Sequence, residues 1–437
     1  MFKPLYYLGC KASISETIRE AIDAADPHRG RVCDLFAGSG AISANLMASR
    51  DVTSVDIQEY SRVICDAQLN PAQMSAFELS KVPTEVAESG ALHTLGFCLE
   101  ALMELEQEAA LSALSGKPTD MVALIEAPPL LFSTSESGRG KLAQARKLAR
   151  ARLIEHNLWN SADSTITRYF GGVYFSYRQA AYLDAALLNA AQRSGKDRNT
   201  LLAAALSTAS TMVNTVGKQF AQPIRPRDKS GNIKLSIISS AIKDRRIDVN
   251  SVHSKWMGDY ATIKATDRPH EAIQGDYLEV LSSRGKDFSV LYADPPYTRD
   301  HYSRFYHVLE TMCLRDEPAI TISTRNGQSE PSRGVYRESR HQSPFCIRST
   351  APAAFDVLFK QARLLSIPLV LSYSPSEQGD GTHPRVLSAT NVINLAQNHY
   401  RSVEVKYLHG KSHNKHNRSS LELAKRSHAE MLIICRL

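Results

Sequence analysis

Cysteine is scarce in this chain and never occurs at the close spacing of a metal-binding pair. The seven cysteines among 437 residues are dispersed, with no Cys-x-x-Cys, which argues against a disulfide framework or a zinc ribbon. Long apolar runs are also missing, so no segment reaches the length of a membrane span. The first residues lead straight into a motif rather than into a signal or transit peptide. We therefore expect a cytoplasmic protein with reduced thiols and no membrane partner.

An extreme composition is missing as well. Hydrophobic residues make up 43% and charged residues 22% of the chain, which is the profile of a folded globular protein. The formal net charge of +7 is compatible with a polyanionic partner but does not establish one. There is no internal repeat and no low-complexity tract. The length allows one large domain or two ordinary ones.

Strand and helix patterns alternate in residues 1–70. Apolar residues recur at helical spacing in 14–25, and a short apolar run at 31–36 ends in a turn that contains glycine. A second helical stretch covers 39–50, and a second strand-like run covers 52–56. This alternation predicts a parallel sheet flanked by helices.

The middle of the chain, residues 71–265, has a different pattern. Its Ala-rich and Leu-rich stretches predict helices, and regular strand alternation is missing. Basic residues cluster here, among them Arg146, Lys147 and Arg150. Such a run is either a solvated helix face or a surface that contacts phosphate, and the sequence leaves both readings open. We expect a large, mainly helical insertion.

Strand signals return in residues 266–437. Apolar runs that predict strands occur at 288–293, 368–373, 403–408 and 431–435. A stretch dense in Ser, Arg and Pro, residues 323–350, predicts a long surface loop. We therefore expect an α/β fold in which residues 1–70 and 266–437 form one discontinuous domain, interrupted by the helical insertion.

A glycine-rich turn, DLFAGSG at residues 34–40, follows the first expected strand. Such a turn lets a ligand approach the backbone, and the next helix directs its N-terminal amides at that ligand. Asp56 follows about 20 residues later, where an acid typically accepts both hydroxyls of a ribose. The third glycine of the dinucleotide fingerprint is missing, which disfavours NAD or FAD and favours a nucleoside without a pyrophosphate. The alternative is an ordinary tight turn of an α/β protein.

The expected strand at 288–293 is followed directly by Asp294, Pro295, Pro296 and Tyr297. This position is the sheet edge where open α/β folds hold ligands, and the two prolines leave rigid carbonyls free to accept hydrogen bonds. The Asp294 carboxylate and the Pro295 carbonyl can hold both hydrogens of an exocyclic amine and direct its lone pair at a methyl group. Tyr297 can stack on the base for roughly 1–3 kcal/mol, once the base is flipped from the duplex. The alternative is a prolyl turn after a strand.

Together, DLFAGSG and DPPY resemble the paired signature of the amino-methyltransferases of DNA. YLGCK at residues 7–11 resembles the N-terminal motif of the Dam-like adenine methylases, known as the D12 class. The order of N-terminal motif, glycine-rich loop, recognition insertion and DPPY is also that of this class. YTRDHYSRFYHVLET (297–311) and YRESRHQSPF (336–345) are similar to D12-type enzymes of restriction–modification and phage defence. Cys10 departs from the pattern, because these enzymes usually have glycine or a small polar residue there.

The resemblance implies a Rossmann-like methyltransferase sheet that uses S-adenosylmethionine and no metal. It makes Asp294, Pro295, Pro296 and Tyr297 the catalytic motif. The residues that it assigns to the cofactor are Tyr7, Gly9, Lys11, Asp34, Phe36, Gly38, Gly40, Asp56 and Asp276. Within this set we expect Lys11 near the methionine carboxylate, Asp56 at the ribose hydroxyls and Asp276 at the adenine amino group. The insertion at 71–265 is expected to recognise double-stranded DNA.

Two further segments add candidates for DNA contacts. Arg299, Tyr302 and Arg304 interleave basic and aromatic side chains after the catalytic motif, as a groove for a phosphate backbone and a flipped base would. A structural loop is the alternative. Near the other end, Lys411, Lys415 and Arg418 lie among several histidines. The many basic neighbours favour phosphate over zinc.

The sequence thus predicts a site-specific DNA methyltransferase that acts on the N6 amino group of adenine. The resemblance places it in a prokaryote or a phage, with restriction or defence proteins as partners besides DNA. Any restriction activity would come from such a partner, since no nuclease motif is recognisable. Three alternatives stay open: cytosine N4 as the target, adenine in RNA as the target, or a catalytically silent DNA-binding specificity subunit.

Overall fold

The computed structural model describes residues 2–133, 140–325, 328–375, 385–408 and 430–437. The chain divides into two compact units: unit 1 is Met1–Pro71, Ile263–Arg304 and His341–Leu437, and unit 2 is Ala72–Thr262 and Phe305–Arg340. This division differs from the expected one in the segment 305–340, which joins the helical unit. Backbone pairing explains the difference, because the Phe305 carbonyl accepts a hydrogen bond from the Phe220 amide at 3.0 Å.

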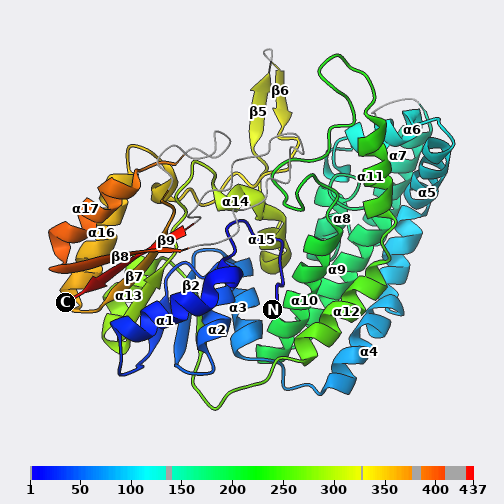
Figure 1. Cartoon of the computed structure of the whole chain (residues 1–437). Helices are drawn as coiled ribbons and strands as arrows, with labels where there is room; N and C mark the ends of the chain where they lie inside the picture. Colours follow the sequence, from blue (N-terminus) through cyan, green and yellow to red (C-terminus); the bar gives the residue numbers. More distant parts are fainter. Residues whose placement is uncertain (1, 134–139, 326–327, 376–384, 409–429) are drawn as a thin grey trace. The chain divides into compact units, whose positions relative to one another are not determined.

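Unit 1 is built on a mostly parallel seven-stranded sheet (Figure 1). Its strands are β1 Val32–Asp34, β2 Val52–Asp56, β3 Glu271–Gln274, β4 Val290–Ala293, β7 Leu369–Tyr373, β8 Ser402–Leu408 and β9 Glu430–Arg436. They lie in the order β3-β2-β1-β4-β7-β9-β8, in which the first five are parallel and β9 is antiparallel to both of its neighbours. The start of β9 therefore lies at the same edge of the sheet as the carboxyl ends of the parallel strands.

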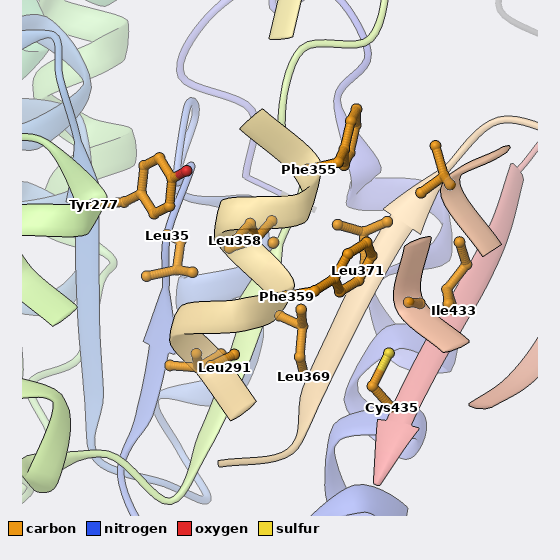
Figure 2. Close-up of a cluster of buried hydrophobic side chains, with 14 of the residues drawn as sticks. Leu35, Tyr277, Leu291, Phe355, Leu358, Phe359, Leu369, Leu371, Ile433 and Cys435 are labelled. Atoms are coloured by element: carbon orange, nitrogen blue, oxygen red, sulfur yellow. The ribbon is translucent and has the colours of Figure 1, made fainter. Parts of the chain in front are cut away.

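Helices cover both faces of this sheet. They are α1 Ser15–Ala25, α2 Ala41–Leu46, α3 Glu59–Leu69, α13 Tyr277–Arg284, α16 Ala351–Leu364 and α17 Ala389–His399, with the short α14 Tyr302–Phe305 beyond the catalytic motif. Successive strand residues point to opposite faces. Val370 therefore packs in a cluster with Ile18 of α1, whereas Leu371 packs in a cluster with Phe355 of α16 (Figure 2). Burial on both faces explains why the strands are continuous apolar runs in the sequence.

Six of the seven strands coincide with the runs predicted from the sequence, which confirms those predictions. The seventh, β3, is not anticipated, because this edge strand is only partly buried and lacks an apolar run. The helix expected over 39–50 is shorter, as α2 begins after Gly40, whose φ of 74° is left-handed, and ends at Leu46.

Unit 2 is mainly helical. Its helices are α4 Ala76–Ala87, α5 Gly90–Leu114, α6 Thr119–Glu126, α7 Lys141–Glu155, α8 Thr165–Phe170, α9 Tyr177–Ala191, α10 Gly195–Met212, α11 Leu235–Arg245, α12 Val249–Ala261 and α15 His307–Leu314. The long α5 lies beside α7 and α9 (Figure 1), and its buried Leu99 and Leu102 share a core with Leu153 and Ala181 of those helices. No helix within the described ranges is long and apolar enough to cross a membrane.

The surface loop expected at 323–350 is wrong in two respects. An antiparallel hairpin begins within unit 2 just before this stretch, with β5 Ile322–Arg325 paired to β6 Gln328–Pro331. Further along, Val335 and Phe345 are buried rather than exposed. The polar composition hides these features, because single buried residues between Ser and Arg produce no periodic apolar pattern.

Candidate active site

A cavity of about 370 Å³ opens at the carboxyl edge of the parallel strands in unit 1. Sites for small molecules typically span about 300–1,000 Å³, so its size fits such a ligand. The residues predicted from the sequence that line it are Tyr7, Gly9, Lys11, Asp34, Phe36, Gly38, Asp56, Asp276, Asp294, Pro295, Pro296, Tyr297 and Tyr302. The fold thus brings three separate sequence motifs to one site.

The glycine-rich loop forms one wall of the cavity. The Gly38 amide donates to Asp56 Oδ2 at 2.9 Å, and the Gln58 amide donates to Asp56 Oδ1 at 3.0 Å. Burial raises the pKa of Asp56, although these two amides act in the opposite direction. Gly38 has a φ of 54°, and a Cβ there would lie 2.6 Å from the Tyr7 hydroxyl oxygen. Glycine at this position therefore allows Tyr7 to lie against the loop.

Gly40 lies between two residues of the cavity lining, Ser39 and Ala41. It is absent from the cavity lining, and a Cβ on it would lie 2.6 Å from Gln68 Nε2 on α3. The side chain of Gln68 donates to the Ser39 carbonyl at 2.9 Å. Glycine at this position provides the left-handed φ of 74° and leaves room for the Gln68 side chain against the loop.

Asp34 presents an unsatisfied acceptor beside the cavity. It is 1% exposed, and its Oδ2 accepts a hydrogen bond from Ser43 Oγ at 2.8 Å. Its Oδ1 is buried and has no hydrogen-bond partner among the described residues. Burial raises the pKa of Asp34 to about 7, and the charges of Asp294 and Asp56 reinforce it. The Ser43 hydroxyl and the Phe36 amide act in the opposite direction, although the Phe36 amide does not reach hydrogen-bond geometry with Oδ1. A donor on a ligand would satisfy this oxygen.

Lys11 is bound by carboxylates of the protein. The sequence predicts it beside the carboxylate of the cofactor; the structure instead places its Nζ 2.9 Å from Asp294 Oδ2 and 3.5 Å from Glu430 Oε2. Burial alone would lower the pKa of Lys11, but Asp294 and Glu430 outweigh it and raise that pKa well above its usual value. Lys11 is therefore a cation beside the DPPY motif itself.

Tyr297 is surrounded by cations and by a second ring. Lys11 Nζ lies 5.5 Å and the Arg385 guanidinium carbon 5.2 Å from the centroid of its ring, distances at which cation–π attraction acts. Tyr373 of β7 contacts the ring edge-on, with centroids 5.2 Å apart. The Val386 amide donates to the Tyr297 carbonyl at 3.2 Å, which fastens the motif to the segment that carries Arg385.

Tyr302 lies in the wall of the cavity, next to the N-terminal motif. Its hydroxyl donates to the Leu8 carbonyl at 3.2 Å, and its ring lies 5.6 Å from that of Tyr7. Gly9 leaves room for it, since a Cβ there would lie 3.2 Å from the Tyr302 hydroxyl oxygen. Tyr302, which the sequence predicts as a DNA contact, thus holds residues 7–9 over the cavity.

Aromatic rings and α13 build the opposite end of the cavity. Phe36 packs against Tyr277 and Phe345, with centroids 5.0 and 5.4 Å away. Asp276 caps α13, because its Oδ1 accepts from the Leu278 amide at 2.8 Å. His341 also lines this end. Burial lowers the pKa of His341, although the nearby Asp276 and Asp56 act to raise it.

The residues that sequence reasoning missed are Glu430, Arg385, His341 and Phe345. The sequence contains some indication of three of them. His341 and Phe345 lie in the segment 336–345, which is similar to D12-type enzymes, and Glu430 immediately precedes a predicted strand. The sequence contains no indication of Arg385, because it is an isolated basic residue far from every motif.

The predicted DNA contacts have different environments. Arg146 is buried, and its guanidinium donates to the carbonyls of Pro128 and Pro129 at 2.7 and 3.0 Å. This corrects its predicted role, because a phosphate contact needs an exposed group. Lys147 is exposed, and Arg150 is half-buried with its guanidinium 4.9 Å above the Trp159 ring.

Two of the remaining candidates, Arg299 and Arg304, are outside the cavity lining. Arg299 is exposed and Arg304 is half-buried. Lys411, Lys415 and Arg418 fall outside the described residues, so their prediction is not tested. Across the residues that the structure describes, no group of His, Cys, Asp or Glu is arranged to hold a metal ion.

One family model matches this sequence. The D12 class N6 adenine-specific DNA methyltransferase family matches residues 7–88, which include the N-terminal motif, the glycine-rich loop and Asp56. No curated protein matches the chain significantly. Over residues 7–88 the chain is therefore similar to the D12 class of N6 adenine-specific DNA methyltransferases, the family that its motifs resemble.

Proposed function

We propose that this protein transfers a methyl group from S-adenosylmethionine to the N6 amino group of adenine in DNA. One observation carries the proposal: Asp294, at the catalytic motif, opens onto the same cavity as Asp56 and Asp276. The family match over residues 7–88 covers the loop that bounds this cavity. The order β3-β2-β1-β4 also agrees with the doubly wound, Rossmann-like sheets that bind nucleotides at this edge.

The cavity residues fit S-adenosylmethionine. Bound there, this cofactor supplies an electrophilic methyl group on a positively charged sulfonium. The carboxylates of Asp34, Asp56 and Asp276 line the cavity and favour a cation, whereas Asp294 is already paired with Lys11. The unpartnered Oδ1 of Asp34 can accept a hydrogen bond from the cofactor, and Phe36 offers an apolar surface for a base.

Asp294 and Pro295 hold the target amine in this proposal. Two acceptors fix both hydrogens of the exocyclic amine, so that its lone pair points toward the methyl group. Lys11 pairs with Oδ2 of Asp294, and in this proposal Oδ1 accepts the hydrogen of the amine. The proton leaves after the nitrogen has attacked, so the protein needs no strong general base. Flipping of the adenine brings it within reach of these groups.

We assign DNA recognition to unit 2, in a restriction–modification or phage-defence setting in the cytoplasm of a prokaryote. Two observations support this assignment. The helical segment is inserted in the chain between β2 and β3, as the recognition region is in the D12 motif order. Its exposed basic residues, such as Lys147, suit a phosphate backbone.

Transfer of labelled methyl from S-adenosylmethionine to genomic DNA and to total RNA tests the proposal. Nucleoside mass spectrometry should find N6-methyladenine in the DNA. N4-methylcytosine, or label in RNA, would keep the chemistry and change the substrate. No label together with no cofactor binding by calorimetry would contradict the enzyme assignment, and DNA binding without cofactor binding would favour a specificity subunit.

A further inference from the structure

Glu430 is a third charged group at the catalytic motif, and it comes from a strand that the motifs do not include. It begins β9, the antiparallel strand between β7 and β8. Because β9 runs against β7, its first residue lies at the edge where the parallel strands end. A parallel strand at this place would carry its first residue to the opposite edge of the sheet.

The contacts of Glu430 centre on Lys11. Glu430 is 3% exposed, with Oε2 3.5 Å from Lys11 Nζ and Oε1 3.4 Å from the Ser372 hydroxyl. A buried carboxylate is costly unless a cation and hydrogen bonds compensate it. Burial and Asp294 raise the pKa of Glu430 to about 7, whereas Lys11 and Arg385 lower it. The charged groups that face it are therefore Lys11, Asp294 and Arg385.

The Lys11 ammonium has three hydrogen-bond donors and three acceptors within reach. They are Asp294 Oδ2 at 2.9 Å, the Gly9 carbonyl at 3.4 Å and Glu430 Oε2 at 3.5 Å. A lysine side chain has a flexible stem and a point charge, so its direction depends on all the acceptors around it. The second carboxylate, on the rigid sheet, defines where the ammonium lies.

We propose that Glu430 is a positioning residue for methyl transfer. It holds the Lys11 ammonium against Oδ2 of Asp294, so that the Asp294 carboxylate keeps one orientation and presents Oδ1 to the target amine. This inference rests on the proposed function. Glu430 acts through Lys11, because Lys11 contacts both Glu430 and Asp294 of the catalytic motif.

Glu430→Gln tests this role, with Glu404→Gln as the matched control. Glu404 lies on the adjacent β8, is exposed and pairs with Arg436, away from the cavity. The assay is single-turnover methyl transfer to genomic DNA from a strain without adenine methylation, at saturating S-adenosylmethionine. We expect E430Q to be about 10- to 100-fold slower, as for a small misplacement of a catalytic group, with unchanged cofactor affinity by calorimetry. E404Q should match the wild type.

A double-mutant cycle with Lys11→Met separates positioning from a structural role. If Glu430 acts through Lys11, the double variant should be no slower than Lys11→Met alone, because the same contact has been removed. If the rate loss of the double variant equals the product of the losses of the two single variants, the proposal is overturned, even where E430Q also lowers the melting temperature. A wild-type rate for E430Q would overturn it as well. Absence of label with the wild-type protein would count against the proposed function instead.

Discussion

Two buried aspartates show how differently the two units use the same charge. Asp34 in unit 1 and Asp184 in unit 2 are each 1% exposed, and burial raises the pKa of each carboxyl to about 7. Both oxygens of Asp184 accept backbone hydrogen bonds at the start of α8, from the amides of Ile166 and Thr167 at 2.9 and 2.8 Å. In Asp34, Ser43 satisfies one oxygen and the other is unpartnered beside a cavity.

Burial and pKa are the same for these two acids, so neither property separates a structural acid from a ligand-binding one. Their hydrogen-bond partners do. A carboxylate whose acceptors are filled by the backbone stabilises a helix start. One that keeps an empty acceptor at a cavity bears a desolvation cost that a ligand can offset. On this criterion we expect Asp34 to be a ligand-binding acid of unit 1, whereas Asp184 belongs to the fold of unit 2.

The largest expected effect is on catalysis. Asp294→Ala should slow methyl transfer by at least about 100-fold, comparable to the loss of one essential polar contact to a reacting group. Calorimetry should show cofactor binding largely retained, because Asp294 acts on the target base. Near-normal activity would contradict the role assigned to the motif.

Next in size is the stability of unit 2. Arg146→Ala removes a buried guanidinium from the Pro128 and Pro129 carbonyls, and we expect a loss of about 1.5–3 kcal/mol in the free energy of unfolding. Lys147→Ala, on the exposed face one residue along α7, should stay within about 0.5 kcal/mol. Urea unfolding compares the two, and equal losses would contradict the buried role of Arg146.

Asp184→Asn and Asp34→Asn form the direct test of the comparison. The amide introduced by Asp184→Asn would lose one of two backbone hydrogen bonds and should destabilise the protein by about 1–3 kcal/mol. This variant should leave the affinity for S-adenosylmethionine unchanged. Asp34→Asn should weaken that affinity about 10-fold, or about 1.4 kcal/mol, with little change in stability. The reverse assignment of effects would contradict the distinction between the two acids.

The pH dependence of cofactor binding should also distinguish them. The pKa of Asp34 is raised to about 7, and a cationic ligand lowers it by favouring the ionised form. Binding near pH 6.5 should therefore release a proton, and affinity should increase as pH rises toward 7 and level off above it. Calorimetry in buffers of different ionisation enthalpy measures the proton. Asp34→Asn should reduce the release, whereas Asp184→Asn should not.

The smallest expected effect concerns DNA binding by unit 2. Lys147→Glu should weaken DNA binding and reduce the salt slope by about one contact, if Lys147 touches a phosphate. Measuring the dissociation constant at several salt concentrations gives this slope. An unchanged slope would show that Lys147 belongs to a solvated helix face.

Sequence patterns predicted most of the sheet and many residues of the cavity lining, for a physical reason. Buried strands such as β4 and β7 need apolar residues on both faces, so they are visible as runs. Asp34, Asp56 and Asp294 are recognisable because each ends a strand in a fixed motif. Glu430 and Arg385 reach the site only through tertiary pairing with distant strands, and Arg146 resembles its exposed neighbours until burial is known.

The antiparallel β9 also has a consequence for folding kinetics. Lys11 and Glu430 are in contact although almost the whole sequence separates them, and both segments of unit 2 lie between them in the sequence. Contacts of such large sequence separation form late, since the entropy of closing the loop must be lost before they stabilise anything. A refolding chain should therefore regain helical signal well before it regains methyl transfer. Chains in which β9 has not yet paired would lack the complete ion cluster, and the proposed methyl transfer would be slow in them.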